Sequence, residues 1–224
     1  MLNLKTCAAI AAALFAGAAS AATTNGFANG GFELAGGGGQ IAAGWLTAAT
    51  ASPASLSGDA HSGSFALLLS APGGFDASIA LQDSFAHGGN PELGAANVGD
   101  MPWLSFWAKG DASVTGNAFV TVRYMGAAGN IISTGLNQQF QSLINTSGWT
   151  QISFQAGAIP VGTSKLFIQI GTSVGPILEG RPNAVLVDDL QFTLTTAPVP
   201  EPETYALMLT GLGLVGAIAR RRRA

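Results

Sequence analysis

The stretch AVLVDDLQFTL, residues 184–194, alternates between two sets of side chains. Strict alternation is typical of a β-strand, in which successive side chains point to opposite faces of a sheet. One set contains Leu186, Asp188, Leu190 and Phe192. We expect this set to face the core, which would make Asp188 a buried carboxylate. A buried carboxylate costs free energy unless a hydrogen-bond donor or a cation compensates it.

The same alternation recurs along the chain in six more stretches separated by Gly, Asn, Pro and Ser clusters: residues 64–70, 77–85, 103–110, 117–125, 149–156 and 164–171. Short alternating strands at this spacing predict an all-β fold, an antiparallel β-sandwich with long loops. The expected core residues on these strands are Phe106, Val120, Val122, Ile152, Phe154, Leu166 and Ile168.

The charge balance excludes one class of function. Charged residues make up only 9% of the 224 residues. Residues 22–198 contain ten of the 12 acidic residues, all except Glu201 and Glu203. They contain only four of the nine basic residues, because Lys5 and the four arginines at 220–223 lie outside. The acidic body therefore lacks the basic surface that nucleic-acid binding requires.

The N-terminus has the pattern of a secretory signal peptide over residues 1–21. Lys5 precedes an apolar stretch at 8–19, and Ala19-Ser20-Ala21 supplies a small-x-small cleavage site. We expect the Sec translocon and signal peptidase to process it. Cys7, the only cysteine, would leave with the peptide, so the mature chain would have no disulfide.

The C-terminus has an uncharged apolar run of 15 residues, Tyr205–Ala219, followed by four arginines at 220–223. As a helix this run would be roughly 22 Å long, and flanking arginines can compensate for a short span. Clustered arginines stay on the cytoplasmic side of a membrane. We therefore predict a transmembrane helix with a cytoplasmic tail over 204–224, joined by a linker at 196–203 to the sandwich domain at 22–195.

The end of the chain also resembles the PEP-CTERM sorting signal of Gram-negative bacteria. The resemblance rests on a proline–acid–proline step, an apolar run and an arginine cluster, with Val199, Pro200, Glu201, Pro202, Arg220, Arg221, Arg222 and Arg223 as the motif residues. It implies cleavage by an exosortase, a membrane transpeptidase, after transient anchoring in the inner membrane. The product would reach the cell surface or extracellular matrix. A permanent one-helix anchor is the alternative.

Several phrases along the body resemble carbohydrate-binding modules with a galactose-binding-type jelly roll. They are residues 29–33, 44–45, 58–67, 104–109, 148–154 and 187–190. The resemblance implies a structural calcium ion near the first and last strands. Glu33 and Asp188 would supply charge, Asp189 could substitute, and carbonyls of residues 58–63 would complete the shell. Alternatively, Asp188 accepts backbone N–H bonds or pairs with Arg181.

Outward-facing side chains on the predicted strands are the candidate ligand contacts, because aromatic rings stack on sugars and Gln or Arg bonds hydroxyls. The candidates are Trp107, Arg123, Gln151, Gln155, Phe167 and Gln169. The alternative is that a loop covers this face, or that Trp107 helps to fill a second layer. Trp45, Trp103 and Trp149 are expected in the core.

The sequence contains no motif for nucleophilic or metal-dependent catalysis, and its two histidines, His61 and His87, lie in loop-like phrases. We therefore predict a non-enzymatic, exported surface or matrix protein that associates with extracellular polysaccharide. The alternative is a structural or adhesive protein that binds other proteins without glycan recognition.

Overall fold

The computed structural model describes residues 22–48, 52–83, 93–112, 115–177, 183–196 and 210–212. The chain divides into two compact units, Thr23–Thr195 and a second one formed by Met1–Ala22 with Thr196–Ala224. Within the second unit, residues 210–212 are helical. None of the helices found in the described residues has the length and apolar character needed to span a membrane. The predicted signal peptide and most of the predicted transmembrane segment lie outside the described residues.

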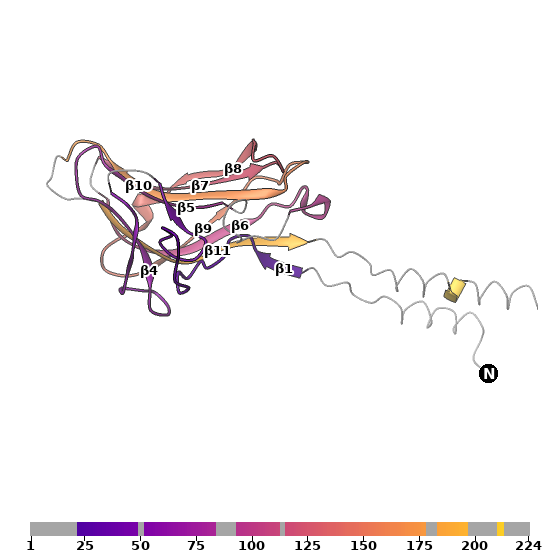
Figure 1. The fold of residues 1–224 in the computed structure, drawn as a ribbon, viewed down its shortest axis with the longest axis horizontal. Coiled ribbons are helices and arrows are strands. Elements are labelled where there is room, and N and C mark those ends of the chain that lie inside the picture. Colours follow the sequence, from indigo (N-terminus) through magenta and orange to yellow (C-terminus); the bar gives the residue numbers. More distant parts are fainter. Residues whose placement is uncertain are drawn as a thin grey trace, which may run out of the picture. The chain divides into compact units, whose positions relative to one another are not determined.

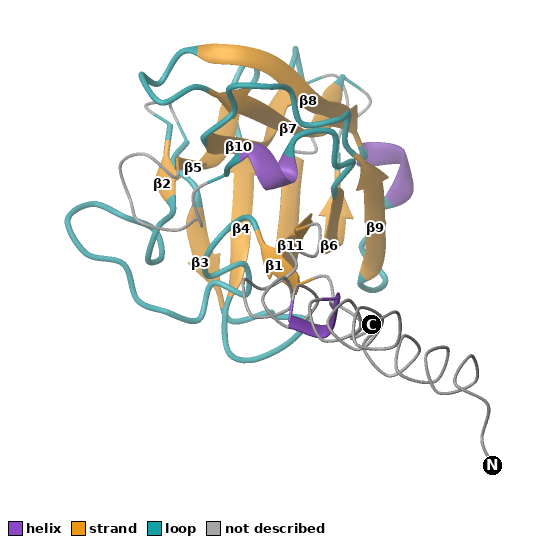
Figure 2. Ribbon diagram, turned by 90° about the vertical axis from the view of Figure 1, so that its right-hand side faces the viewer, coloured by secondary structure: helices purple, strands orange, loops and turns teal. Residues whose placement is uncertain are grey.

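The body is a sandwich of two sheets that form two layers (Figure 1). The larger sheet has the order β3 (Ser55–Ser57), β4 (Ala66–Ala71), β11 (Asn183–Thr196), β6 (Trp103–Asp111) and β9 (Thr150–Gln155), and β1 (Ala22–Asn25) also pairs with β11. The five-stranded sheet has the order β2 (Leu46–Thr47), β5 (Ala77–Asp83), β10 (Lys165–Val174), β7 (Gly116–Met125) and β8 (Ile131–Gln139). Two short 3₁₀ helices, η1 (Ala95–Asn97) and η2 (Gln141–Leu143), lie in the connections. Figure 2 shows the two sheets from the side.

The predicted all-β sandwich is confirmed, and each of the seven predicted strands corresponds to an observed one. The sequence missed the short strands β1, β2 and β3, and also β8. Most side chains of β8 are exposed, so it has no alternating apolar pattern to identify it.

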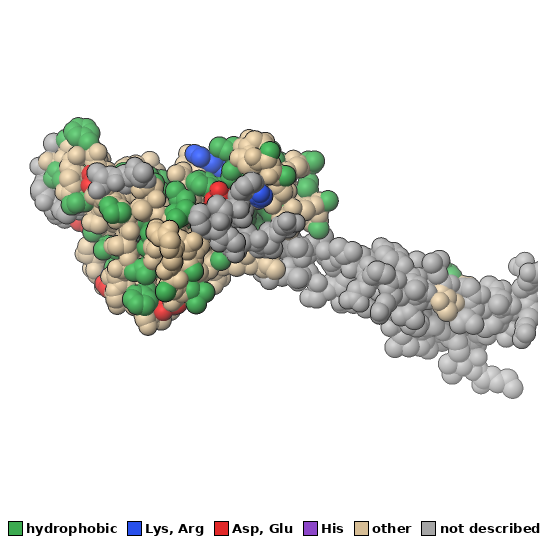
Figure 3. All heavy atoms as spheres, viewed as in Figure 1, with side chains coloured by type: hydrophobic (Ala, Val, Ile, Leu, Met, Phe, Trp, Pro, Cys, Tyr) green, Lys and Arg blue, Asp and Glu red, His purple; other side chains and the backbone are tan. Residues whose placement is uncertain are grey.

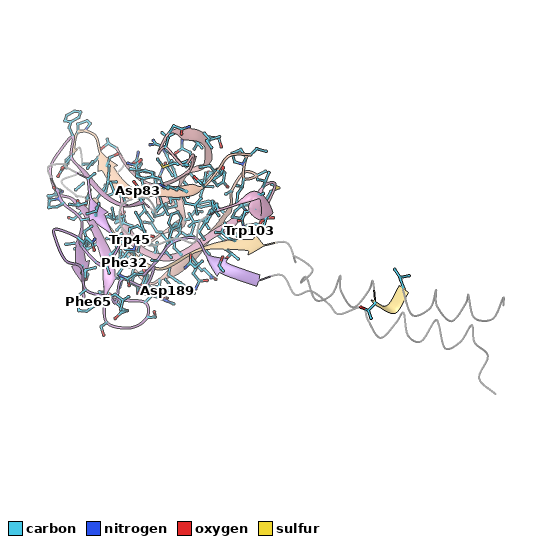
Figure 4. The ribbon with its side chains drawn as sticks, turned by 45° about the vertical axis from the view of Figure 1, so that its right-hand side comes forward. Phe32, Trp45, Phe65, Asp83, Trp103 and Asp189 are labelled. Carbon is cyan, nitrogen blue, oxygen red and sulfur yellow. The ribbon has the colours of Figure 1, made fainter. Side chains whose placement is uncertain are left out.

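The core lies between the sheets and contains the expected alternate residues. Phe106, Val120, Val122, Leu166 and Ile168 are fully buried. Ile152 is almost fully buried, and Phe154 is partly buried and packs against the core residues. Trp45 is buried as predicted, and its ring lies 5.1 Å from that of Phe32 (Figure 4).

A β-bulge in β11 overturns the predicted orientation of Asp188. Along β6, Trp107 pairs with Asp188 and Ser105 with Gln191, so β11 carries one residue too many between them. Before the bulge Val185 and Val187 are buried, and after it Leu190 and Phe192 are buried. The prediction that Asp188 shares the core face with Leu190 is therefore wrong.

Asp188 instead lies on the outer face of the larger sheet. It is directly opposite Trp107, and paired residues on neighbouring strands share a face. Both neighbours of Trp107 in β6, Phe106 and Ala108, point into the core, so Trp107 points outward. Asp189 lies within the bulge, and its backbone has a left-handed conformation with φ of 50°.

The N-terminal segment joins the sandwich at this bulge. The Leu190 amide donates to the Gly30 carbonyl oxygen at 2.9 Å, and the Phe192 amide donates to Asn25 Oδ1 at 2.9 Å. A Cβ at Gly30 would lie 1.8 Å from the Leu190 carbonyl oxygen. Only glycine allows the two segments to approach so closely.

We expect the substitution Gly30→Ala to lower the free energy of unfolding by about 1–3 kcal/mol, because the methyl group collides with backbone that cannot rotate away. Gly37→Ala is the matched control, since a Cβ there meets nothing within 4 Å. Urea unfolding followed by tryptophan fluorescence measures both. Equal stability of the two variants would contradict the close approach at Gly30.

Candidate functional site

The loop of residues 58–65, between β3 and β4, is held by the carboxylate of Asp188. Asp188 Oδ2 accepts hydrogen bonds from the backbone amides of His61 at 2.9 Å and Ser62 at 3.1 Å. Asp188 Oδ1 accepts the amide of Asp189 at 2.7 Å. The side chain is buried beneath the loop although it lies on the outer face of the sheet. The alternative considered from the sequence, in which Asp188 accepts backbone N–H bonds, is observed.

Two further carboxylates bind the same loop. Asp189 Oδ2 lies 2.7 Å from His61 Nδ1, and Asp189 Oδ1 accepts the Ser62 hydroxyl at 2.7 Å. Glu33 Oε1 accepts the amides of Ser64 and Phe65, both at 2.8 Å. Glu33, which is far in the sequence from the adjacent pair Asp188 and Asp189, therefore meets that pair at residues 61–65. Figure 4 labels Asp189 and Phe65 in this part of the molecule.

This carboxylate cluster has little compensating positive charge. His61 pairs with Asp189 and Lys109 pairs with Asp59, and neither Glu33 nor Asp188 forms an ion pair with a described Lys or Arg. Burial raises the pKa of the Asp188 carboxyl above its usual value, and the negative charge of Asp189 adds to this rise. The amide donors of Ser62, Asp189 and His61 lower the same pKa and offset part of the rise.

The side chains alone do not form a metal centre in this structure. Within the part of the chain that is described, no group of three or more His, Cys, Asp or Glu side chains is arranged to hold a metal ion. A calcium ion at Glu33 and Asp188 would need backbone carbonyls for most of its ligands. Arg181, the other partner considered for Asp188, lies outside the described residues. Calcium binding stays a prediction.

His61 covers one face of the Trp107 ring. The two rings are stacked, with centroids 3.9 Å apart and an interplanar angle of 13°. The rings of His61 and Trp149 are in an edge-to-face arrangement, with centroids 5.8 Å apart. The Lys109 ammonium lies 5.4 Å from the centre of the Trp149 ring. His61, a residue of the loop, thus covers the face of the Trp107 ring on which a sugar would have to stack. This agrees with the alternative prediction that a loop covers this surface.

The six predicted ligand contacts are divided between the two sheets. Trp107, Gln151 and Gln155 lie on β6 and β9 of the larger sheet, whereas Arg123, Phe167 and Gln169 lie on β7 and β10 of the five-stranded sheet. The outer faces of a sandwich point in opposite directions, so the six side chains cannot form one site. Gln155 pairs with Trp103, which is 49% exposed, so the expected core position of Trp103 is wrong.

Three of the six predicted ligand contacts, Arg123, Phe167 and Gln169, lie in two neighbouring rows on the outer face of the five-stranded sheet. Asp83, Phe167 and Arg123 are opposite one another on β5, β10 and β7. Leu81, Gln169, Thr121 and Asn137 form the next row across β5, β10, β7 and β8. We call these seven residues the glycan-candidate face. None of the seven side chains is buried.

Two contacts hold side chains of this face in position. The Arg123 guanidinium carbon lies 5.7 Å from the centre of the Phe167 ring. The Thr121 hydroxyl donates to Asn137 Oδ1 at 3.1 Å. Sequence reasoning missed Asp83 and Thr121, although both share the outward parity of their predicted strands. It could not have found Asn137, because β8 was not predicted.

Residues 198–223 match the family model described as the PEP-CTERM protein-sorting motif. The chain carries a PEP-CTERM sorting motif. The match contains all of the motif residues named from the sequence, Val199–Pro202 and Arg220–Arg223, which lie outside the described residues. The motif marks this PEP-CTERM chain as an exported protein that is processed at the membrane.

Several solved structures are similar to this chain. The enzymatically active domain of tailspike protein 4 of bacteriophage CBA120 superposes with a TM-score of 0.54 at 16% identity, over 76% of this chain and 21% of the tailspike chain. TmCBM61 in complex with β-1,4-galactotriose has a TM-score of 0.45 at 15% identity, over 75% of this chain and 97% of that one. The CBM22-1 xylan-binding domain of Paenibacillus barcinonensis Xyn10C has a TM-score of 0.43 at 14% identity, over 80% of this chain and 96% of that one. At 16% identity the likeness to the tailspike domain concerns the fold alone. A sequence search of curated proteins found no match.

We expect Asp188→Ala to lower the free energy of unfolding by about 1–3 kcal/mol, because the amides of His61, Ser62 and Asp189 lose the charged acceptor that lies beneath the loop. Asp59→Ala removes a carboxylate from the same loop, but Asp59 is 54% exposed, so its loss should cost less than about 1 kcal/mol. Chemical unfolding compares the two. A larger effect for Asp59 would contradict the role assigned to Asp188.

Proposed function

We propose that this chain is a non-enzymatic, exosortase-processed protein of the cell surface or extracellular matrix of a Gram-negative bacterium, and that its sandwich binds extracellular polysaccharide. The PEP-CTERM motif at residues 198–223 supports processing by an exosortase after transient anchoring in the inner membrane. The glycan-candidate face supports the second half of the proposal.

The observation that carries glycan binding is the row Asp83, Phe167 and Arg123. A flat aromatic ring is flanked on its two neighbouring strands by a hydrogen-bond acceptor and a donor. Sugars present a C–H face that packs on an aromatic ring and a rim of hydroxyls that needs both donors and acceptors. Gln169, in the next row, supplies an amide with both properties.

The dimensions and charge of this face favour a neutral, extended ligand. It crosses four strands, and strands about 4.8 Å apart give a width of about 14 Å, more than one monosaccharide covers. Asp83 and Arg123 contribute one charge of each sign. The side of the molecule that Figure 3 draws carries mainly hydrophobic and other uncharged side chains and few charged ones.

The adhesive alternative has one observation in its favour. Phe75, in the turn between β4 and β5, is 83% exposed, and Leu34 is also exposed in the N-terminal segment. Exposed aromatic side chains are frequent anchors of protein–protein contacts. A protein partner would use such loop residues rather than the rows of the five-stranded sheet.

Binding of a neutral polysaccharide should fall about tenfold in Phe167→Ala, the ratio produced by losing about 1.4 kcal/mol of ring stacking and apolar burial. Phe75→Ala makes the same chemical change on an exposed turn and should bind as the wild type does. A glycan array selects the ligand, and affinity electrophoresis in its presence measures the effect. Wild-type binding by Phe167→Ala, or loss in Trp107→Ala instead, would overturn the assignment of this face. An array without any binding would favour the adhesive alternative.

We also propose that calcium stabilises the sandwich through the carboxylates of Glu33 and Asp188, with Asp189 as a substitute ligand. Support comes from charge, since three carboxylates meet one loop and, of the described basic side chains, only His61 pairs with any of them. A divalent cation there would relieve the repulsion between Asp188 and Asp189.

Adding calcium should therefore raise the melting temperature of the wild type, and EDTA should reverse the rise, because an ion that binds only the folded state stabilises it by mass action. The increment should vanish in Glu33→Gln, which keeps an oxygen acceptor for the amides of Ser64 and Phe65. Melting that is identical in calcium and in EDTA would exclude this ion.

A further inference from the structure

One end of the sandwich carries a group of exposed apolar side chains, which we call the apolar end. Met101 is 54% exposed, Trp103 is 49% exposed and Val161 is 80% exposed. The full set is Val98, Met101, Trp103, Ile131, Ile132 and Val161, and all six are exposed. None of the six is charged, and neither the proposed glycan face nor the carboxylate cluster uses any of them.

Backbone contacts bring the three segments of the apolar end together. The Gly99 amide donates to the Ile159 carbonyl, and the Ile159 amide donates to the Asp100 carbonyl, both at 2.9 Å. The Ala156 amide donates to the Pro102 carbonyl at 2.8 Å. A Cβ on Gly162 would lie 3.7 Å from Ile132 Cδ1. Residues 98–103, 156–162 and 131–132 therefore form one continuous part of the surface.

The chain leaves the sandwich at this end. Thr193, three residues before the end of β11, pairs with Trp103, the first residue of the antiparallel strand β6, so β11 ends near Trp103. Figure 4 shows Trp103 beside the end of β11. The sorting motif starts at residue 198, and Pro200 is four residues beyond Thr196. Four residues span at most about 14 Å, so Pro200 cannot be farther than that from the end of β11.

We propose that the apolar end docks on the lipid surface of the membrane that holds the PEP-CTERM precursor. This inference rests on the proposed anchoring of the chain before exosortase cleavage. Tryptophan is favoured at the membrane–water interface, where its ring is apolar and its N–H stays hydrated. A tether this short makes the encounter intramolecular, so a modest apolar patch suffices to hold the domain against the bilayer. The acidic body and the uncharged patch favour contact with zwitterionic lipid rather than attraction to anionic headgroups.

Docking of this kind would deliver the cleavage site in a fixed geometry. With the apolar end on the lipid surface, the proline–acid–proline step stays at the membrane, where a membrane enzyme acts. Cleavage removes the tether and with it the high effective concentration, so the same patch then releases the domain. The patch thus serves the precursor and not the product.

The test uses the full chain reconstituted into phosphatidylcholine vesicles with or without bromine atoms on the acyl chains. None of the four tryptophans lies in residues 196–224, so fluorescence quenching by the bromines reports on the sandwich. We expect the wild type to be quenched and Trp103→Phe to lose most of this quenching. Trp149→Phe is the matched control and should retain it, because Thr150 pairs with Ala108 at the other end of β6.

Flotation of the chain with the vesicles separates the two proposals. Chains that do not float overturn both the anchor and the docking, whereas chains that float without being quenched overturn only the docking. Quenching that is equal in Trp103→Phe and the wild type also overturns the docking. Tryptophan emission that changes with protein density but not with bromination would assign the apolar end to a second copy of the chain instead.

Discussion

The single residue inserted into β11 between Asp188 and Gln191 determines which side chains of the last strand reach the core. It lets Val187 and Leu190 both point inward while the intervening Asp188 points outward. Three parts of the chain attach at this place: the N-terminal segment through Gly30 and Asn25, the loop 58–65 through the two aspartates, and β6 through Trp107. Bulges increase local twist and redirect side chains, and here the redirected side chain is the carboxylate that organises the loop.

The alternation of apolar residues predicted the sandwich, seven of its strands and most of the named core residues, because burial on one face imposes a period of two. Leu186, Trp103 and Trp149 were expected in the core and do not belong to it. The same rule failed at Asp188, since a bulge shifts the period by one and no residue type in the Asp-Asp step marks the shift. It also failed for β8, whose side chains are mostly exposed. The candidate ligand set was correct in parity but mixed two faces, because alternation shows which side of its sheet a residue occupies and not to which sheet its strand belongs.

The two outer faces of the sandwich consequently differ in what they can do. On the larger sheet, His61 stacks on Trp107 and the loop is secured by carboxylates, so the surface is used for stability. On the five-stranded sheet, Phe167, Arg123 and Gln169 remain accessible in adjoining rows. The third surface, at the end where β11 stops, carries the exposed Trp103. The stabilising surface, the proposed glycan face and the proposed membrane-docking end thus occupy separate regions of the sandwich.

Hydrogen exchange at the loop tests the central role of the bulge most directly. The amides of His61, Ser62, Ser64 and Phe65 belong to exposed residues but donate to Asp188 and Glu33. If these carboxylates hold the loop, the four amides should exchange many times more slowly than those of the exposed glycines at 36–39, at a rate set by opening of the surrounding structure. Exchange as fast as in the glycine segment would contradict the account, because the loop would then not be fixed by the bulge in β11.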